Sequence, residues 1–110
     1  MYVIGWSSST GDADWGIRPL VAVESEPPMS YNICYYENEE VDKLLYDALS
    51  TADETKRAEF YAQAQDILWE DCPMVCLVND YNTWATTNKI ANVKVYPDNC
   101  LNIRNARMAK

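Results

Sequence analysis

The 110 residues include 17 acidic and 9 basic side chains, which give a net charge of −8, and no histidine. This charge argues against a nucleic-acid or anionic-membrane partner, because phosphate contacts need a basic face. Without histidine there is no Cys/His metal site and no Ser-His-Asp triad. The length allows one domain or part of one, and no run approaches the roughly 20 apolar residues of a membrane span.

The first predicted elements are a strand at residues 2–4, a polar loop and a short helix. Residues 2–4 are strand formers. The loop that follows, called the hydroxyl loop below, consists of residues 5–11 and contains Gly5, Trp6, Ser7, Ser8, Ser9, Thr10 and Gly11. Asp12 or Asp14 then caps a helix near Trp15 that Pro19 limits to a turn or two. Open α/β sheets bind ligands at such strand–loop–helix junctions.

Two amphipathic helices are expected in the middle of the chain. The first is capped by Asn38, and its apolar residues recur at helical spacing: Val41, Leu44, Leu45, Ala48 and Leu49. The second is capped by Asp53 and ends by Cys72, because Pro73 follows. Before them, the tyrosines at 31, 35 and 36 either line a cleft or, as the better interpretation, pack against the next helix. The short break at residues 50–52 predicts a helical hairpin, which we expect to lie on a sheet.

The remainder of the chain is predicted to be mostly strand. Residues 73–78 form a continuous apolar run that is typical of a strand buried on both faces. Residues 81–87 favour another strand, and a turn follows at Asn88-Lys89. Residues 93–96 alternate as a half-buried strand that ends at residues 97–99, and Leu101 and Ile103 alternate again. Residues 104–110 lack periodicity and are expected to fray.

The four cysteines have no metal-site or redox-motif spacing. Cys72 and Cys76 form a CxxxC pattern interrupted by Pro73, and Cys34 and Cys100 lie far from both. Four cysteines permit three complete disulfide pairings, and the sequence does not choose among them. Buried free thiols are at least as compatible with the sequence. We expect no metal, no cofactor and no redox role.

The hydroxyl loop with Gly11-Asp12-Ala13-Asp14 resembles a segment of the bacterial dipeptide- and oligopeptide-binding proteins, the solute-binding components of ABC importers. This family includes nickel- and glutathione-binding members. Later stretches resemble the same family: Asn38-Glu39-Glu40-Val41-Asp42-Lys43-Leu44-Leu45, Lys56-Arg57-Ala58-Glu59-Phe60-Tyr61 with Ala64-Gln65 and Ile67-Leu68, and Asp71-Cys72-Pro73. Their order and spacing are similar to the C-terminal fifth of these proteins.

The resemblance implies an α/β fold in which a helical hairpin packs on a small mixed sheet, as part of the C-terminal lobe of a two-lobed protein. Residues 1–80 would be lobe material, and residues 81–110 would be crossover strands and a tail toward the first lobe. The implied location is periplasmic or cell-surface. Because such proteins are exported and no leader is apparent, we expect this chain to be a piece of a longer protein.

In dipeptide and oligopeptide binders, the residue three positions after the tryptophan is an aspartate that pairs with the α-amine of the ligand. Here that residue is Ser9, which offers no charge, and the loop instead resembles that of glutathione-binding members. The resemblance therefore implies that residues 5–10 contact a glutathione-like or peptide ligand. It implies that Asp12 and Asp14 brace the loop without contacting the ligand.

Three functions are compared. The first is a piece of a solute-binding protein that delivers peptides or glutathione to an ABC permease. The second is a stand-alone α/β protein-interaction domain that binds no small molecule and associates with another copy through an exposed sheet edge. The third, an enzyme, is disfavoured because the chain has no histidine for general-base or triad chemistry, and because two carboxylates on a capping segment, such as Asp12 and Asp14, are usually structural.

Overall fold

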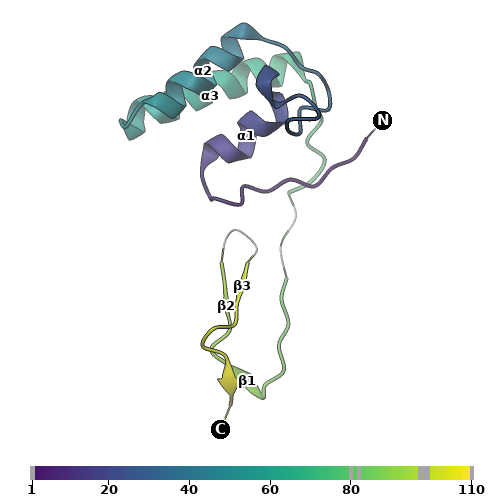
Figure 1. Cartoon of the computed structure of the whole chain (residues 1–110), viewed down its shortest axis with the longest axis vertical. Coiled ribbons are helices and arrows are strands. Elements are labelled where there is room, and N and C mark those ends of the chain that lie inside the picture. Colours follow the sequence, from purple (N-terminus) through teal and green to yellow (C-terminus); the bar gives the residue numbers. More distant parts are fainter. Residues whose placement is uncertain (1, 80, 82, 97–99, 110) are drawn as a thin grey trace.

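The computed structural model describes residues 2–79, 81, 83–96 and 100–109, and it contains both helices and short antiparallel strands (Figure 1). The coarse α/β class is therefore confirmed. The helices are α1 (Ala13–Val21), the 3-10 helix η1 (Val23–Ser25), α2 (Glu39–Ser50) and α3 (Glu54–Asp71). The strands are β1 (Ile90–Ala91), β2 (Lys94–Val95), β3 (Leu101–Asn102) and β4 (Arg107–Met108). In the described part of the chain, no helix is long and apolar enough to cross a membrane.

The predicted helical hairpin of α2 and α3 is confirmed, and so are its caps. The Asn38 side chain accepts hydrogen bonds from the backbone N–H groups of Glu40 and Val41, and the Asp53 side chain caps α3 in the same way. These bonds occupy donors that the first turn of a helix leaves unpaired. The second helix ends at Asp71, and Cys72 follows in the left-handed conformation at φ 48°.

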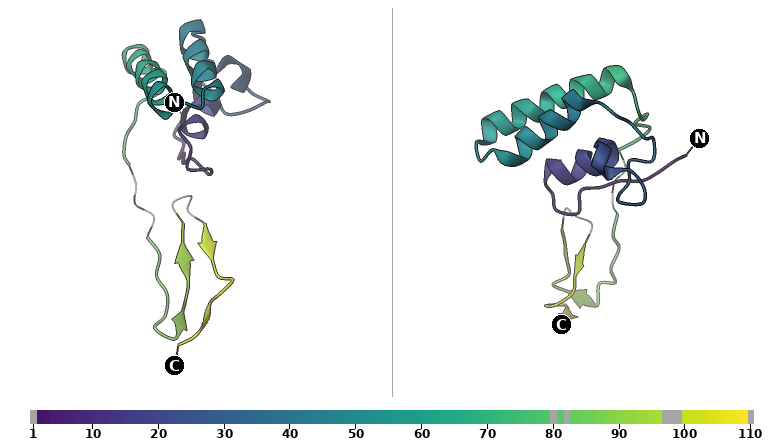
Figure 2. Two further views of the ribbon diagram at one scale, coloured as in Figure 1. Left: turned by 90° about the vertical axis from the view of Figure 1, so that its left-hand side faces the viewer. Right: turned by 45° about the horizontal axis from the view of Figure 1, so that its top comes forward.

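The core lies between the helical hairpin and α1, which corrects the expectation that the hairpin packs on a sheet. Its buried apolar side chains come from α1, the residue after it, α2 and α3: Leu20, Val21, Ala22, Val41, Leu44, Leu45, Ala48, Tyr61 and Ala64. Figure 2 shows α2 and α3 side by side, with α1 against them and the strands well below. The apolar face of the hairpin is therefore covered by α1, which precedes the hairpin in the chain.

Three predicted strands are not formed. Residues 2–4, 73–78 and the described part of 81–87 belong to neither ladder. Val75 and Val78 are 71% and 86% exposed, whereas the apolar run had predicted burial on both faces. Strand propensity describes how a segment fits a sheet, and it does not supply the neighbouring strand.

The C-terminal strands form two separate antiparallel pairs, β1 with β4 and β2 with β3. The predicted turn at residues 88–89 and strand character near residues 94–95 and 101–102 are confirmed, and the predicted stop at residues 97–99 lies outside the described residues. The expectation that residues 104–110 fray is wrong for β4, which pairs with β1 through backbone groups that side-chain periodicity does not reveal.

Candidate functional site

The hydroxyl loop lies at the N-terminal end of α1 and leaves most of its surface open to solvent. Gly5, Ser7, Ser9, Thr10 and Gly11 are exposed, whereas Trp6 and Ser8 are half-buried. Gly11 has φ +72°, a left-handed conformation that favours glycine, and it turns the chain into the helix cap. The loop therefore presents an accessible polar face next to a helix N-terminus.

The orientation of Trp6 is fixed by an unusual feature of α1, which contains Pro19 inside the helix. Proline has no N–H, so the carbonyl of Trp15, four residues earlier, loses its normal helical donor. The indole Nε1–H of Trp6 donates to this carbonyl at 3.1 Å. This replacement bond explains why α1 continues to Val21, past the turn or two that the sequence predicted.

Two neighbouring aromatic rings flank the Trp6 ring. The ring centroid of Trp15 lies 6.5 Å from it, and that of Tyr31 lies 4.9 Å away at an interplanar angle of 57°. These distances are typical of tilted aromatic pairs. Tyr31, for which packing against the next helix was the better interpretation of the sequence, thus contacts the ring of Trp6.

The four hydroxyls of the loop divide into two kinds. The Ser8 hydroxyl donates to the carbonyl of Asp12 at 2.7 Å and lies 3.3 Å from the Thr10 hydroxyl, which accepts from the backbone N–H of Asp12 at 3.2 Å. Ser8 and Thr10 therefore shape the loop itself. Among the residues that the structure describes, the hydroxyls of Ser7 and Ser9 have no such partner, and both residues are exposed.

The carboxylate of Asp12 joins the loop to the helical hairpin. It caps α1 by accepting from the backbone N–H of Asp14 at 2.8 Å, and it receives both Nη groups of Arg57 at 2.7 and 2.9 Å. The hydrogen bonds from Arg57 are the main reason that the pKa of Asp12 lies below its usual range. Because this carboxylate already occupies the N-terminus of α1, the helix end is not an open anion site.

Arg57 also contacts the other helices, and sequence reasoning missed this role. Its Nε donates to the Ala48 carbonyl in the last turn of α2 at 3.2 Å, and Nη2 lies 3.3 Å from the Tyr61 hydroxyl. One guanidinium therefore connects the cap of α1, the end of α2 and the first turns of α3. The Arg–Asp contact has a sequence separation of 45 residues, so no local pattern indicates it.

Asp14, unlike Asp12, pairs with a residue of its own helix, Arg18. Its two carboxylate oxygens accept from Nε and Nη2 of Arg18 at 2.8 and 2.9 Å, and Arg18 also pairs with Glu24 at 2.7 Å. Asp14 is only 8% exposed. It is therefore poorly placed to meet a ligand, in contrast to the exposed serines of the loop.

A second residue that sequence reasoning missed is Asn32, which is fully buried. Its Nδ2 donates to the carbonyls of Ala22 at 3.1 Å and Tyr36 at 2.9 Å, and its Oδ1 accepts from the Tyr36 N–H at 3.1 Å. These bonds hold the loop between η1 and α2 against the end of α1. They also set the backbone next to Tyr31, which in turn contacts Trp6.

No protein-family model matches the chain, but individual proteins do. The glutathione-binding protein GsiB of Pectobacterium atrosepticum is 36% identical over 110 residues, which are 100% of this chain and 21% of that protein. The proteins of the same name from Escherichia coli (strain K12) and Shigella flexneri are each 38% identical over 98 residues, 89% of this chain and 19% of each relative. The chain is thus similar, along its whole length, to one part of these proteins. The resemblance to ABC-transporter solute-binding proteins is thereby confirmed.

The chain spans about a fifth of the length of the relatives it matches.

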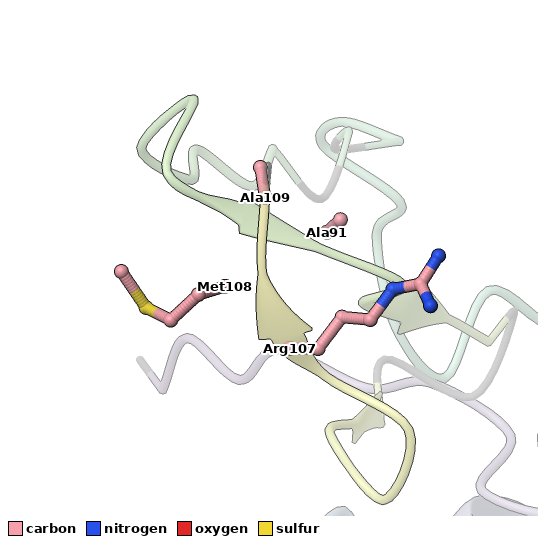
Figure 3. Close-up of a pocket in the computed structure, with 4 residues that line it drawn as sticks. All are labelled: Ala91, Arg107, Met108 and Ala109. Carbon is pink, nitrogen blue, oxygen red and sulfur yellow. The ribbon is translucent and has the colours of Figure 1, made fainter.

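The described residues also include two hollows away from the hydroxyl loop. The smaller, of about 320 Å³, is lined by Ala91, Arg107, Met108 and Ala109 beside the β1–β4 pair. In Figure 3 the side chains of Arg107 and Met108 extend away from each other, so no polar groups converge there.

The larger hollow has a volume of about 750 Å³ and lies between α1, α3 and the segment after α3. Its lining in the described chain is mostly apolar and includes no charged side chain. Glutathione carries two carboxylates and an ammonium group, so this hollow does not match its chemistry. The described residues likewise include no cluster of three potential metal ligands.

All four cysteines are exposed in the structure, and Cys34, Cys72 and Cys76 are free thiols. The possibility of buried thiols is therefore wrong for all four, and none of the three complete disulfide pairings is formed. Cys72 and Cys76 both line the larger hollow.

Proposed function

We propose that this chain is part of an extracytoplasmic solute-binding protein that delivers glutathione or a peptide to an ABC importer, and that residues 5–10 form one side of the ligand site. Residues 1–80 would belong to the C-terminal lobe and residues 81–110 to the crossover toward the first lobe. We propose no catalytic role and no cofactor. The kinship with glutathione-binding proteins supports this assignment.

The site assignment rests on the different roles of the hydroxyl groups in the hydroxyl loop. Ser8, Thr10 and Asp12 hold the loop, while Ser7 and Ser9, which lie within three residues of Trp6 in the sequence, are exposed. A rigid aromatic wall with a few placed polar groups is the usual composition of a small-molecule site. In this proposal, Trp6 packs on the backbone of the ligand, and the two serines donate to its carboxylates or amides.

An open loop on one side gives only part of a binding site. Solute-binding sites that close around a ligand bury most of its surface, and a single exposed face does not. We therefore expect the isolated chain to bind glutathione weakly, with an affinity on the order of 100-fold below that of a complete receptor. Isothermal titration calorimetry measures both.

A chimaera tests the assignment directly. The matched segment of the Pectobacterium relative, 21% of that protein, is replaced by this chain, and glutathione affinity is measured. We expect the chimaera to bind, and Trp6→Ala to weaken binding at least tenfold. The matched control is Trp84→Ala, which removes a tryptophan that is 49% exposed and far along the chain from the loop.

Two results would contradict the proposal. One is a folded chimaera in which Trp6→Ala and Trp84→Ala bind glutathione equally well. The other is an isolated chain that already binds as tightly as the chimaera, because then no opposing surface is needed.

The second candidate, a protein-interaction domain without small-molecule binding, is favoured by one feature. The apolar residues 74–78 after α3 lie exposed at the surface. This alternative would be favoured if a folded chimaera did not bind glutathione and residues 74–78 bound another protein molecule.

A further inference from the structure

Pro19, inside α1, leaves two carbonyl groups of the helix open to residues from outside it. Its ring has no N–H, so the Trp15 carbonyl accepts from the indole of Trp6 at 3.1 Å. The carbonyl of Pro19 itself lies in the last turn, where a helix has no further donors, and it accepts from the backbone N–H of Tyr31 at 3.2 Å. Two aromatic residues that lie outside the helix are therefore attached to it through Pro19.

These two attachments hold the Trp6 ring on two sides. The bond to the Trp15 carbonyl fixes the edge that carries Nε1, and the centroid of the Tyr31 ring lies 4.9 Å from that of Trp6. The two carbonyls are four residues apart, which is about one turn, so α1 itself sets their spacing. Asn32, directly after Tyr31, is fully buried and its backbone N–H donates to the Ser25 carbonyl at 2.8 Å, so the chain at Tyr31 is held as well.

Pro19 does not contact a ligand, because its side chain is fully buried. Any other residue at this position supplies a backbone N–H, which bonds to the Trp15 carbonyl as the ordinary helical donor. The indole then loses its acceptor, and the Trp6 side chain is free to turn among its rotamers. The orientation of the Trp6 ring thus depends on a buried residue.

We propose that Pro19 is a positioning residue of the ligand site, which fixes the Trp6 ring in its ligand-binding orientation because it supplies no N–H to the Trp15 carbonyl. This inference rests on the proposed function, which assigns Trp6 to one side of the site. A ring that is already fixed loses little freedom when a ligand packs on it, and such preorganisation raises affinity without an added contact. Pro19 therefore contributes to ligand affinity only through Trp6.

The first test follows the indole N–H of Trp6 by NMR in the 110-residue chain, where Trp6→Phe identifies its signal. In Pro19→Ala this N–H should exchange with water roughly three- to tenfold faster than in the parent, because it has lost one hydrogen bond. The matched control is Val21→Ala, which also removes two carbon atoms from a buried side chain of α1 but adds no N–H. It should leave the exchange unchanged.

The second test measures glutathione affinity in the chimaera described above. Pro19→Ala should weaken binding roughly three- to tenfold, and Val21→Ala less than about twofold. The double variant of Trp6→Ala with Pro19→Ala should bind no more weakly than Trp6→Ala alone, because no indole is left for Pro19 to position. A general loosening of the fold would instead add its own loss to that of Trp6→Ala.

A change outside the core keeps the inference testable if circular dichroism shows that Pro19→Ala unfolds the helices. Replacement of Trp6 by 3-benzothienylalanine retains a bicyclic ring of similar size but has sulfur in place of the indole N–H. It should weaken glutathione binding by the same roughly three- to tenfold, because it removes the same hydrogen bond to the Trp15 carbonyl.

Several outcomes would overturn the inference while the parent chimaera binds glutathione. They are unchanged indole exchange in Pro19→Ala, equal losses of affinity in Pro19→Ala and Val21→Ala, additive losses in the double variant, and unchanged binding with 3-benzothienylalanine at position 6. A parent chimaera that does not bind glutathione would instead overturn the proposed function, and this inference with it.

Discussion

The hydrogen bond from Trp6 to the Trp15 carbonyl predicts a specific energetic coupling between Trp6 and Pro19. Trp6→Phe keeps an aromatic ring but removes the N–H that donates at 3.1 Å. A neutral hydrogen bond contributes about 0.5–1.5 kcal/mol net, and this one is partly accessible to water, so we expect a loss of about 0.5–1 kcal/mol from the bond itself. A further loss comes from the smaller ring.

Pro19→Ala separates these two contributions. Alanine at position 19 supplies the backbone N–H that proline lacks, and this donor reaches the Trp15 carbonyl as an ordinary helical bond. Trp6→Phe should therefore cost less in the Pro19→Ala background, by about 0.5–1 kcal/mol, because only the loss from the smaller ring remains. Proline 19 is fully buried, so Pro19→Ala has its own cost, which the double-mutant cycle cancels.

The assay is urea unfolding monitored by helical circular dichroism for the parent, the two single variants and the double variant. Trp84→Phe, in an exposed segment, is the matched control and should change the free energy of unfolding little. Equal costs of Trp6→Phe in both backgrounds would refute the idea that the indole replaces the donor missing at Pro19.

The other predictions concern the contacts that hold the loop and its surroundings. Arg57→Gln should loosen the loop and speed amide exchange at its cap, whereas Lys43→Gln, which removes a similar but exposed ion pair, should leave that exchange unchanged. Since the pKa of Asp12 is lowered in the folded chain, its contribution to stability is present above the ordinary carboxyl pKa of about 4 and is lost as the pH falls through the lower folded value. Urea unfolding at several pH values should show a smaller loss in Arg57→Gln than in the parent, because Asp12 then keeps only the hydrogen bond from the Asp14 N–H. Asn32→Ala should lower the free energy of unfolding by about 2–4 kcal/mol, because buried backbone groups lose their partners, while Asn88→Ala in an exposed turn should change it by less than about 0.5 kcal/mol.

The helices were predictable because their signals are local. Asn38 and Asp53 cap within three residues, and the apolar stripe of α2 repeats at the helical period, so neither depends on a distant partner. The position of the hydroxyl loop before a helix was equally visible. Its internal structure was not, because the sequence treats four hydroxyls alike while the structure uses only Ser8 and Thr10 to hold the loop.

The features that sequence reasoning missed all depend on residues far apart in the chain. The helix α1 passes through Pro19 because a side chain nine residues before Trp15 supplies the missing donor. Arg57 reaches Asp12 across 45 residues. The apolar run at residues 73–78 forms no strand in the described ladders, so the prediction of a strand buried on both faces is wrong.

The separation of the helices from the strand pairs has a consequence for how the chain melts. The buried apolar cluster draws no residue from β1–β4, and the radius of gyration of 17.9 Å exceeds the roughly 13 Å of a compact chain of this length. Because the helices and the strand pairs share no residue of this buried cluster, we do not expect them to unfold cooperatively, and heating should unfold them in separate steps. Amide protons of the strand ladders should exchange far sooner than those of α2, and calorimetry should record an unfolding enthalpy that belongs to the helical half alone.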